Sequence, residues 1–414
     1  MLMSEAESNW SPKSPIMKFP MHRTKLLAAV TSALFLLLVS AVLGYSELYI
    51  MSAAIGCVPI ASYVAGKIGM RKLRCTRDAL DFANEDEPFR IRLDLMHKSH
   101  FLGPVEIEDN LPEWIERQDV SAQEGDSAVS YTAIARKRGE YVIGPIRLHA
   151  SDPLGFFHFR CRYPLTSRLV VLPNPLVIPD LAVAPMGMLG EYQFEGSGAK
   201  GSGIDFHGVR EYQRGDDLRR VHWRSTAKHN RLNVIEFEHS RAQDAMIAID
   251  LRRGSEVGRG LYTSLEYAVR IAAGIIEQTM ESGSSARLVG DGITGTAAAF
   301  GQGIGHLHIL MDALARVRAD RDRSLSDVVL GELYGIRENT SVICLAEAID
   351  EGMIPCADLL ISRGTSLQFV LVNVSGEDRE HELAGDLALA GASLVVVDCS
   401  TSRVEGRVRY RYAV

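Results

Sequence analysis

The chain has 414 residues, a net charge of −7, 46% hydrophobic residues and 23% charged residues. This length predicts two or three folded units, and this composition excludes a mostly disordered or fibrous chain. The acidic balance argues against a protein whose main task is coating nucleic acid, because that task leaves a domain-wide basic surface.

Two apolar runs follow a short N-terminal arm, residues 1–25. The first run, 26–46, has 21 residues without a charge, and only Glu47 separates it from the second run, 48–66. A helix needs about 20 residues to cross a bilayer core. Residues 26–66 are therefore predicted to form a two-helix transmembrane hairpin, in which Pro59 is compatible because membrane helices tolerate proline.

The charges on either side of this hairpin predict its orientation. The turn carries Glu47, whereas the flanks carry Lys13, Lys18, Arg23, Lys25, Lys67, Arg71, Lys72, Arg74 and Arg77. Because cationic flanks stay cytoplasmic, we expect a multi-pass protein of the cell (inner or plasma) membrane whose soluble domains are cytoplasmic. A cleaved signal peptide is the alternative, since Lys25, an apolar run and the small residues Ser40 and Ala41 resemble one. The second run and its basic flank favour the hairpin.

Residues 67–180 are predicted to form an antiparallel β-sandwich. Short runs of alternating apolar and polar residues occur at 89–95, 129–134, 141–148 and 169–172. A period of two with glycine and proline between the runs is typical of antiparallel strands. This region shows no obvious chemistry.

Residues 241–414 alternate between apolar strands and longer helical stretches. Strands are predicted at 245–251, 285–290, 341–346, 366–374 and 393–398, and helices near 263–281, 304–318, 352–364 and 380–390. Such alternation indicates a mostly parallel sheet covered by helices on both faces. The fold class predicted for this region is a doubly wound α/β domain.

Between these two regions, residues 181–240 combine a glycine-rich connector with a charged signature segment, 203–238. Composition alone favours a solvated, charged helix with surface salt bridges. Its guanidinium groups, with the rings of Tyr212 and Trp223, could also form a docking surface. We expect Trp223 to be a buried anchor, and Asn233–Glu238 (NVIEFE) to add a strand to the edge of the sheet just before 245–251.

The string VREYQRGDDLRRVHWRSTAKHNRLNVIEFE in this segment resembles the signature of the domain-of-unknown-function fifty-eight family of bacterial and archaeal proteins. Residues 136–157 and the paired apolar runs also match the layout of that family. The signature and interaction residues are Arg210, Glu211, Tyr212, Arg214, Gly215, Asp216, Asp217, Arg219, Arg220 and Trp223. The resemblance implies a C-terminal domain similar to a von Willebrand factor A domain. It also implies a MoxR-class AAA ATPase as partner, and therefore a role in assembly.

Von Willebrand factor A domains often bind a divalent ion through Asp-x-Ser-x-Ser at the end of the first strand. In this chain Asp250 stands at that position, but Arg252 and Gly254 replace the two serines. Fewer oxygen ligands remain for a cation, and we expect Arg252 and Arg253 to satisfy the carboxylate. No metal and no cofactor are therefore predicted. The six cysteines lack a CxxC pair and are expected to be buried and reduced.

The leading hypothesis is a non-enzymatic, membrane-tethered adaptor or assembly factor that binds the bilayer and works with a cytoplasmic ATPase. Homo-oligomerisation stays open. The alternative is a hydrolase or transferase that uses the histidine and aspartate residues of the 203–238 segment: His207, His222, His229, His239, Asp216 and Asp217. No HExxH, GxSxG or phosphate-binding loop accompanies them. Nucleic-acid binding by the arginine-rich patch is least favoured, because the rest of the chain is acidic.

Overall fold

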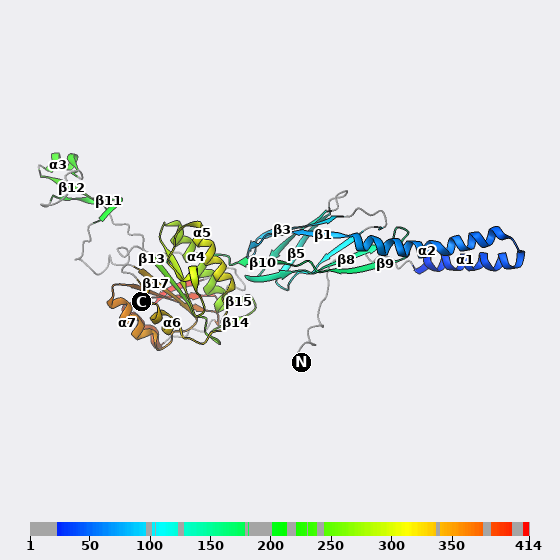
Figure 1. Cartoon of the computed structure of the whole chain (residues 1–414). Helices are drawn as coiled ribbons and strands as arrows, with labels where there is room; N and C mark the ends of the chain where they lie inside the picture. Colours follow the sequence, from blue (N-terminus) through cyan, green and yellow to red (C-terminus); the bar gives the residue numbers. More distant parts are fainter. Residues whose placement is uncertain are drawn as a thin grey trace.

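The computed structural model describes residues 23–96, 102–103, 105–122, 128–178, 181, 201–212, 221–229, 231–237, 244–336, 340–375, 382–399 and 409–413. Figure 1 shows an elongated arrangement of these residues. Helices α1 and α2 lie at one end, several small sheets lie in the middle, and a body of strands and helices lies beyond them.

Helices α1 (Arg23–Leu43) and α2 (Ser46–Lys72) are antiparallel neighbours. Both are long and apolar enough to cross a membrane, with hydropathies of 2.6 and 1.7. The hydroxyl of Ser52 in α2 donates a hydrogen bond to the carbonyl oxygen of Ala33 in α1, at 2.7 Å. Leu34 and Phe35 are 63% and 67% exposed, so the pair presents apolar side chains outward, as helices surrounded by lipid do. Two apolar N-terminal helices are thus confirmed.

Helix α2 is longer than a bilayer core requires. Its 27 residues span about 40 Å at 1.5 Å per residue, against a core of about 30 Å. The additional turns pack on the middle of the molecule. There the hydroxyl of Ser62 donates to the buried Asp152 carboxylate, and the ring of Tyr63 meets that of Phe157 edge-on at 5.3 Å between centroids. The helix therefore continues directly into the next part of the fold.

The middle of the molecule, which we call the β-unit, contains three small sheets around one core. Their orders are β1-β3-β6-β5, β2-β10-β7 and β4-β8-β9, and all pairs are antiparallel except β2 with β10. Antiparallel sheets are thus confirmed for this region. The strands are β1 (Arg74–Asp78), β2 (Phe82–Asn84), β3 (Pro88–Met96), β4 (Val105–Asp109), β5 (Ile115–Ala122), β6 (Ala128–Ala135), β7 (Gly139–Ile143), β8 (Ile146–Ser151), β9 (His158–Tyr163) and β10 (Ser167–Leu172).

The single strand predicted at 141–148 is wrong. The chain leaves β7 at Ile143 and enters β8 at Ile146, and the two strands belong to different sheets. Gly144 has φ +105°, which is outside the range of an extended L-residue, and Pro145 has no N–H to donate to a ladder. The Gly-Pro pair therefore ends one strand and redirects the chain into a second sheet.

The body at the far end, which we call the α/β unit, is built on a six-stranded sheet of order β16-β13-β17-β18-β19-β20. The first five strands in this order are parallel, and β20 is antiparallel to β19. These strands are β13 (Asp244–Ile249), β16 (Ala286–Val289), β17 (Thr340–Ala346), β18 (Ser366–Asn373), β19 (Ser393–Asp398) and β20 (Arg409–Ala413). A short hairpin, β14 (Gly258–Arg259) and β15 (Tyr262–Thr263), precedes the first long helix.

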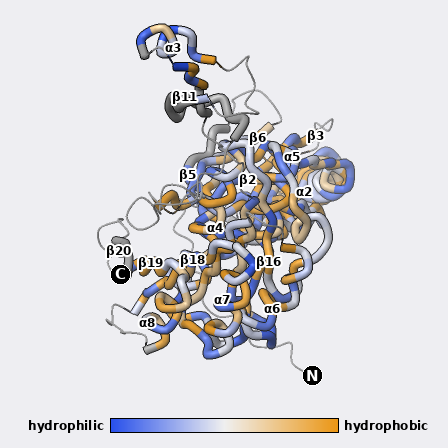
Figure 2. The backbone as a smooth tube through the Cα atoms, turned by 90° about the vertical axis from the view of Figure 1, so that its left-hand side faces the viewer, coloured by the Kyte–Doolittle hydropathy of each residue, from blue (hydrophilic) through white to orange (hydrophobic). Residues whose placement is uncertain are grey.

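Helices cover both faces of this sheet, as its continuous apolar strands predict. On one face α4 and α5 share a core with β13, and on the other α6, α7 and α8 do so. The hydroxyl of Thr263 accepts the N–H of Glu266 and caps α4. Figure 2 shows hydrophobic stretches gathered in this body. The helices are α4 (Ser264–Glu281), α5 (Gly303–Arg316), α6 (Leu325–Gly331), α7 (Met353–Ser362) and α8 (Glu382–Leu389), with 3-10 turns at Gly295–Ala298 and Leu333–Gly335.

The signature segment folds apart from this sheet. Strands β11 (Gly201–Glu211) and β12 (Asn233–Phe237) form their own antiparallel pair, and α3 (Trp223–His229) precedes β12. In Figure 1 these elements stand clear of the α/β unit. The predicted addition of NVIEFE to the main sheet is wrong, because both sides of β13 are already taken, by β16 and β17.

Buried ion pairs and a shared core join the β-unit to the α/β unit. Arg138 pairs with Glu266 at 3.0 Å, with side chains 3% and 4% exposed. Arg270 binds the 1% exposed Glu85 through two nitrogens, at 2.7 and 3.1 Å. Gly274 of α4 lets the segment that follows β10 approach the helix closely. A Cβ at this position would collide with the carbonyl oxygen of Leu176 in that segment. The two units are therefore fixed against each other.

Candidate functional site

The strand order of the α/β unit reverses at one point, and ligands of such folds bind near this point. Strand β16 lies on one side of β13, and the next strand in the chain, β17, lies on the other. In open α/β sheets, ligands bind beyond the carboxyl ends of the strands at this switch point. Asp250 directly follows β13, and Asp350 comes shortly after β17. These two carboxylates define the candidate site.

The Asp250 carboxylate is held by its own loop. Its side chain is 6% exposed, one oxygen accepts the backbone N–H of Arg252 at 2.9 Å, and the other lies 3.8 Å from the Arg252 guanidinium. The hydroxyl of Ser255 donates to the carbonyl oxygen of Arg252 at 2.8 Å and closes the turn. Burial raises the pKa of Asp250, and the Asp350 charge adds to the rise, although both groups of Arg252 oppose it.

Asp350 was not foreseen from the sequence. One of its oxygens accepts the backbone N–H of Ser326, in the first turn of α6, at 3.3 Å. Its other oxygen, Oδ1, is buried and has no hydrogen-bond partner within the described part of the chain. An acidic residue just after a buried parallel strand is the signal that could have found it, because the carboxyl ends of such strands meet at one edge of the sheet.

A neighbouring loop brings basic groups beside the Asp250 loop. The backbone of Arg321 bonds to Leu251 and Arg253, at 3.0 and 2.7 Å, so the loop before α6 lies beside the Asp250 loop. The Arg253 guanidinium donates to the carbonyl oxygen of Asp320 at 3.3 Å. The expectation that both Arg252 and Arg253 serve the Asp250 carboxylate is therefore right only for Arg252.

The residues around Asp250 offer a cation few ligands. Arg252 and Gly254 stand at the two serine positions, and a divalent ion takes six or more oxygens. No cluster of three or more histidine, cysteine, aspartate or glutamate residues with metal-binding geometry occurs among the residues that the structure describes. Absence of a metal site at Asp250 stays a prediction, which calorimetry with Mg²⁺ can test.

Only part of the predicted signature set lies within the described residues. Arg210 and Glu211 end β11, where they pair with Val234 and Asn233 of β12, and the N–H of Tyr212 donates to the carbonyl oxygen of Leu232 at 2.7 Å. Arg214, Gly215, Asp216, Asp217, Arg219 and Arg220 lie outside the described residues. The backbone pairing therefore brings the two ends of the segment together.

Trp223 is not a buried anchor. It is the first residue of α3 and is 71% exposed. An indole ring with that exposure contributes little to folding and is free for contact with a partner. Removing the ring is therefore not expected to leave a cavity in a core.

His222 has a structural use in this segment. Its Nδ1 accepts the backbone N–H of Ser225 at 3.2 Å, so the ring caps the first turn of α3. The hydroxyl of Thr226 accepts the N–H of Asn233 at 3.0 Å and ties α3 to β12. Two of the other candidate histidines lie in this small unit: His207 in β11, and His229 at the end of α3. His239 lies outside the described residues.

The cysteines divide between surface and core. Cys75, Cys344, Cys356 and Cys399 are buried and free, as expected, and burial raises the pKa of each thiol. Cys57 and Cys161 are exposed, which the sequence analysis did not expect.

The described residues thus combine two helices long and apolar enough to cross a membrane, small antiparallel sheets and a parallel sheet covered by helices. A family model described as "Protein of unknown function DUF58" matches residues 208–414, half of the chain, and the chain belongs to this family. The match begins within β11 and covers the whole α/β unit. The resemblance on the signature residues is confirmed at this level.

A relative and two solved structures are also similar to the chain. "Uncharacterized protein YeaD" of Bacillus subtilis (strain 168) is 24% identical over 271 residues, which are 61% of this chain and 64% of that protein. The chain thus spans less than two thirds of that relative. The SrpA adhesin of Streptococcus sanguinis has a TM-score of 0.17 at 12% identity, and covers 25% of this chain and 63% of its own. A mutant of that adhesin has a TM-score of 0.16. No argument on fold or function follows from scores this low.

Proposed function

We propose that this chain is a membrane-anchored, non-enzymatic adaptor or assembly factor that works with an AAA ATPase of the MoxR class. The hairpin α1–α2 spans the membrane twice in this proposal, and the β-unit, the signature segment and the α/β unit lie in the cytoplasm. Lys67, Arg71 and Lys72 at the end of α2 support that orientation, since cationic flanks stay cytoplasmic. The α/β unit is proposed to be similar to a von Willebrand factor A domain that has lost its metal site.

One observation carries this proposal: packed contacts run without interruption from α2 to the parallel sheet. Ser62 binds Asp152 at the base of the β-unit, and Glu85 and Arg138 bind α4 at its top. Such a chain of contacts transmits position, because packed elements and buried ion pairs deform little. An adaptor needs this property to hold its α/β unit at a fixed height above a membrane.

The exposed indole of Trp223 and the basic groups of the signature segment supply the proposed partner surface. Tryptophan and arginine are enriched among residues that dominate binding energy at protein interfaces. Basic side chains at an interface rim affect association more than folding. The sequence resemblance to a family whose members sit beside MoxR-class ATPases supports such an ATPase as the partner. The arginines of the signature segment would fit an acidic face on it.

The proposal is tested by recovering partners with the detergent-solubilised full chain and identifying them by mass spectrometry. Arg214→Glu and Arg220→Glu should leave the melting temperature within about 2 °C and reduce recovery of the ATPase. Arg90→Glu, an exposed reversal in β3, is the matched control and should have no effect on recovery. If no AAA ATPase is recovered with the unmodified chain, or if all three reversals act alike, the adaptor function is wrong.

A further inference from the structure

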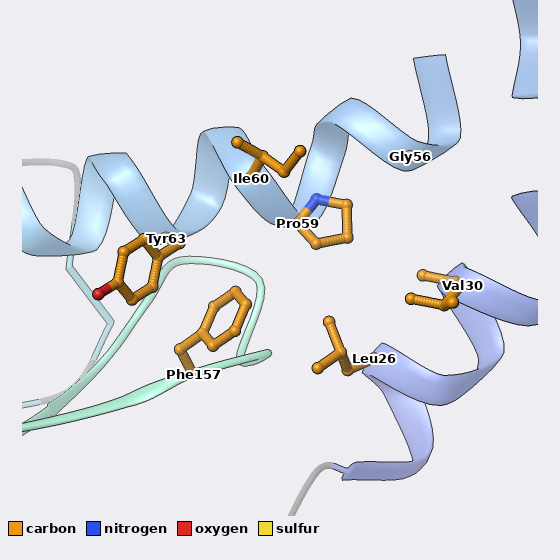
Figure 3. Close-up of a pocket in the computed structure, with 8 residues that line it drawn as sticks. Leu26, Val30, Gly56, Pro59, Ile60, Tyr63 and Phe157 are labelled. Carbon is orange, nitrogen blue, oxygen red and sulfur yellow. The ribbon is translucent and has the colours of Figure 1, made fainter. Parts of the chain in front are cut away.

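A hollow lies where the helical hairpin meets the β-unit. It has a volume of about 400 Å³. Figure 3 shows that side chains from α1, α2 and the loop before β9 surround it. Its lining residues are Leu26, Ala29, Val30, Gly56, Pro59, Ile60, Tyr63 and Phe157.

Small residues and one proline create this space. Gly56 has no side chain, and a Cβ built there meets nothing within 4 Å. Ala29 on the facing helix is also small. Pro59 lacks an N–H, so the carbonyl oxygen of Ile55 loses its backbone hydrogen bond within α2. Neither helix therefore has a large side chain at Ala29 or Gly56 that would fill the space between α1 and α2.

The lining selects an apolar ligand. Every lining side chain is hydrocarbon except that of Tyr63, which carries one hydroxyl. The volume falls within the roughly 300–1,000 Å³ usual for ligand pockets. Phe157 closes the side nearest the β-unit, and its ring contacts Tyr63. Apolar pockets of this kind stay dry, so water is a poor occupant.

Two lysines stand at the end of the hollow that faces away from the turn of the hairpin. Lys25 directly precedes Leu26 and is exposed, and Lys67 lies one helical turn beyond Tyr63, with its ammonium 5.9 Å from the ring centroid. The Asp152 carboxylate is 1% exposed and accepts hydrogen bonds from Ser62 and the backbone of Phe157. Among the described residues it forms no ion pair with either lysine. Positive charge thus stands at the edge of an apolar space.

We propose that the hollow holds one acyl chain of an anionic phospholipid, with the phosphate of its headgroup beside Lys25 and Lys67. This inference rests on the proposed membrane anchoring. The outer faces of the same helices support this proposal, since Leu27 of α1 and Ile50 of α2 are 66% and 70% exposed and would be surrounded by acyl chains. Basic groups at the level of the headgroups attract anionic lipids.

The test measures lipid retained by the full chain. The protein is reconstituted in vesicles of equimolar phosphatidylglycerol and phosphatidylcholine, re-extracted in mild detergent and purified, and its bound phospholipid is quantified by mass spectrometry. About one phosphatidylglycerol per chain is expected. Ala29→Phe, which fills the hollow, should lower retention roughly tenfold, as displacing two methylene groups from a pocket does. Ala28→Phe, at the adjacent residue outside the lining, is the matched control and should retain the lipid.

A second pair of variants separates packing from charge. Gly56→Leu fills the hollow from the other helix and should also lower lipid retention. Because leucine has a higher helix propensity than glycine, a weakened helix would not explain this loss. Lys25→Gln with Lys67→Gln should keep the total bound lipid but abolish the preference for phosphatidylglycerol over phosphatidylcholine.

The outcomes distinguish this proposal from the anchoring on which it rests. If both filling variants retain as much phosphatidylglycerol as Ala28→Phe while all remain in the membrane fraction, the lipid site is wrong and the anchoring stands. If the unmodified chain is released from membranes by alkaline carbonate, the anchoring is wrong and the lipid site falls with it. Equal retention of both lipids by the unmodified chain also overturns the proposal.

Discussion

The contact between the β-unit and the α/β unit predicts a large effect for one substitution, Glu266→Ala. Glu266 accepts from Arg138 at 3.0 Å and lies 3.2 Å from Lys137. Without the Glu266 carboxylate, the buried Arg138 guanidinium keeps one hydrogen bond among the described residues, to the carbonyl oxygen of Val317 at 3.2 Å. Burial already lowers the pKa of Arg138, so its charge is poorly solvated before the change. Removing one partner of a buried pair costs about 3–5 kcal/mol.

This cost corresponds to a fall in melting temperature on the order of 10 °C for a body of this size. Circular dichroism of the detergent-solubilised chain measures it. Arg136→Ala is the matched control, because Arg136 precedes the same turn but is 38% exposed, and its partners Asp86 and Glu116 are 45% and 60% exposed. Exposed pairs contribute about 0–1 kcal/mol.

A compensating variant tests the cause of the loss. Arg138→Met combined with Glu266→Leu removes both charges and keeps apolar volume, and should recover most of the lost stability. Equal melting temperatures for Glu266→Ala and Arg136→Ala would refute the reasoning. So would a double variant that is no more stable than Glu266→Ala, because the unpaired charge would then not be the cause.

Three further predictions concern exposure, protonation and orientation. Trp223→Ala should change the free energy of unfolding by less than about 1 kcal/mol, because the ring is 71% exposed; a larger loss in denaturant titration would place the ring in a core. The raised pKa of Asp250 means that its contribution to stability is full below its ordinary value of 3.8 and is lost as the pH rises through the folded-state pKa. Asp250→Asn should therefore be at least as stable as the unmodified chain at pH 7 and equally stable near pH 3. Urea titrations at both pH values measure this, and a less stable variant at pH 7 would contradict it. The exposed Cys161 should react with an impermeant thiol reagent in permeabilised cells and not in intact ones, in a Cys57→Ser background; labelling of intact cells would reverse the proposed orientation.

The strands of the α/β unit could be predicted because burial on both faces leaves a continuous apolar run. Every residue of β13 after Asp244 is buried, and so is every residue of β17. The edge strand β20 was missed because Arg409–Ala413 alternates arginine and tyrosine and has no such run. Turn chemistry was also missed, because Gly144-Pro145 lies inside a run whose alternation reads as one strand.

In the signature segment, the sequence pattern predicts local structure but not the tertiary contacts. NVIEFE is a strand, but a period of two states only that a strand forms and not which strand it joins. An aromatic residue in a charged run is equally compatible with a core and with a surface, so burial of Trp223 could not be decided. At the candidate site, Asp250 was found through the resemblance to von Willebrand factor A domains. Asp350 belongs to no such motif; its place after the apolar run 341–346 is a signal in the sequence, but only the sheet order shows that β13 and β17 are neighbours.

The shared core between the two units affects where the protein can be cut. Val170, Leu172, Ile178 and Leu181 pack in the same cluster as α4 and β13, although all four precede residue 208, where the family match begins. A fragment that starts there would leave one side of α4 open to water and would lose Glu85, the partner of Arg270. The residues that the family model matches are therefore fewer than those that share the core of the α/β unit. A fragment made to study the α/β unit should consequently keep the β-unit.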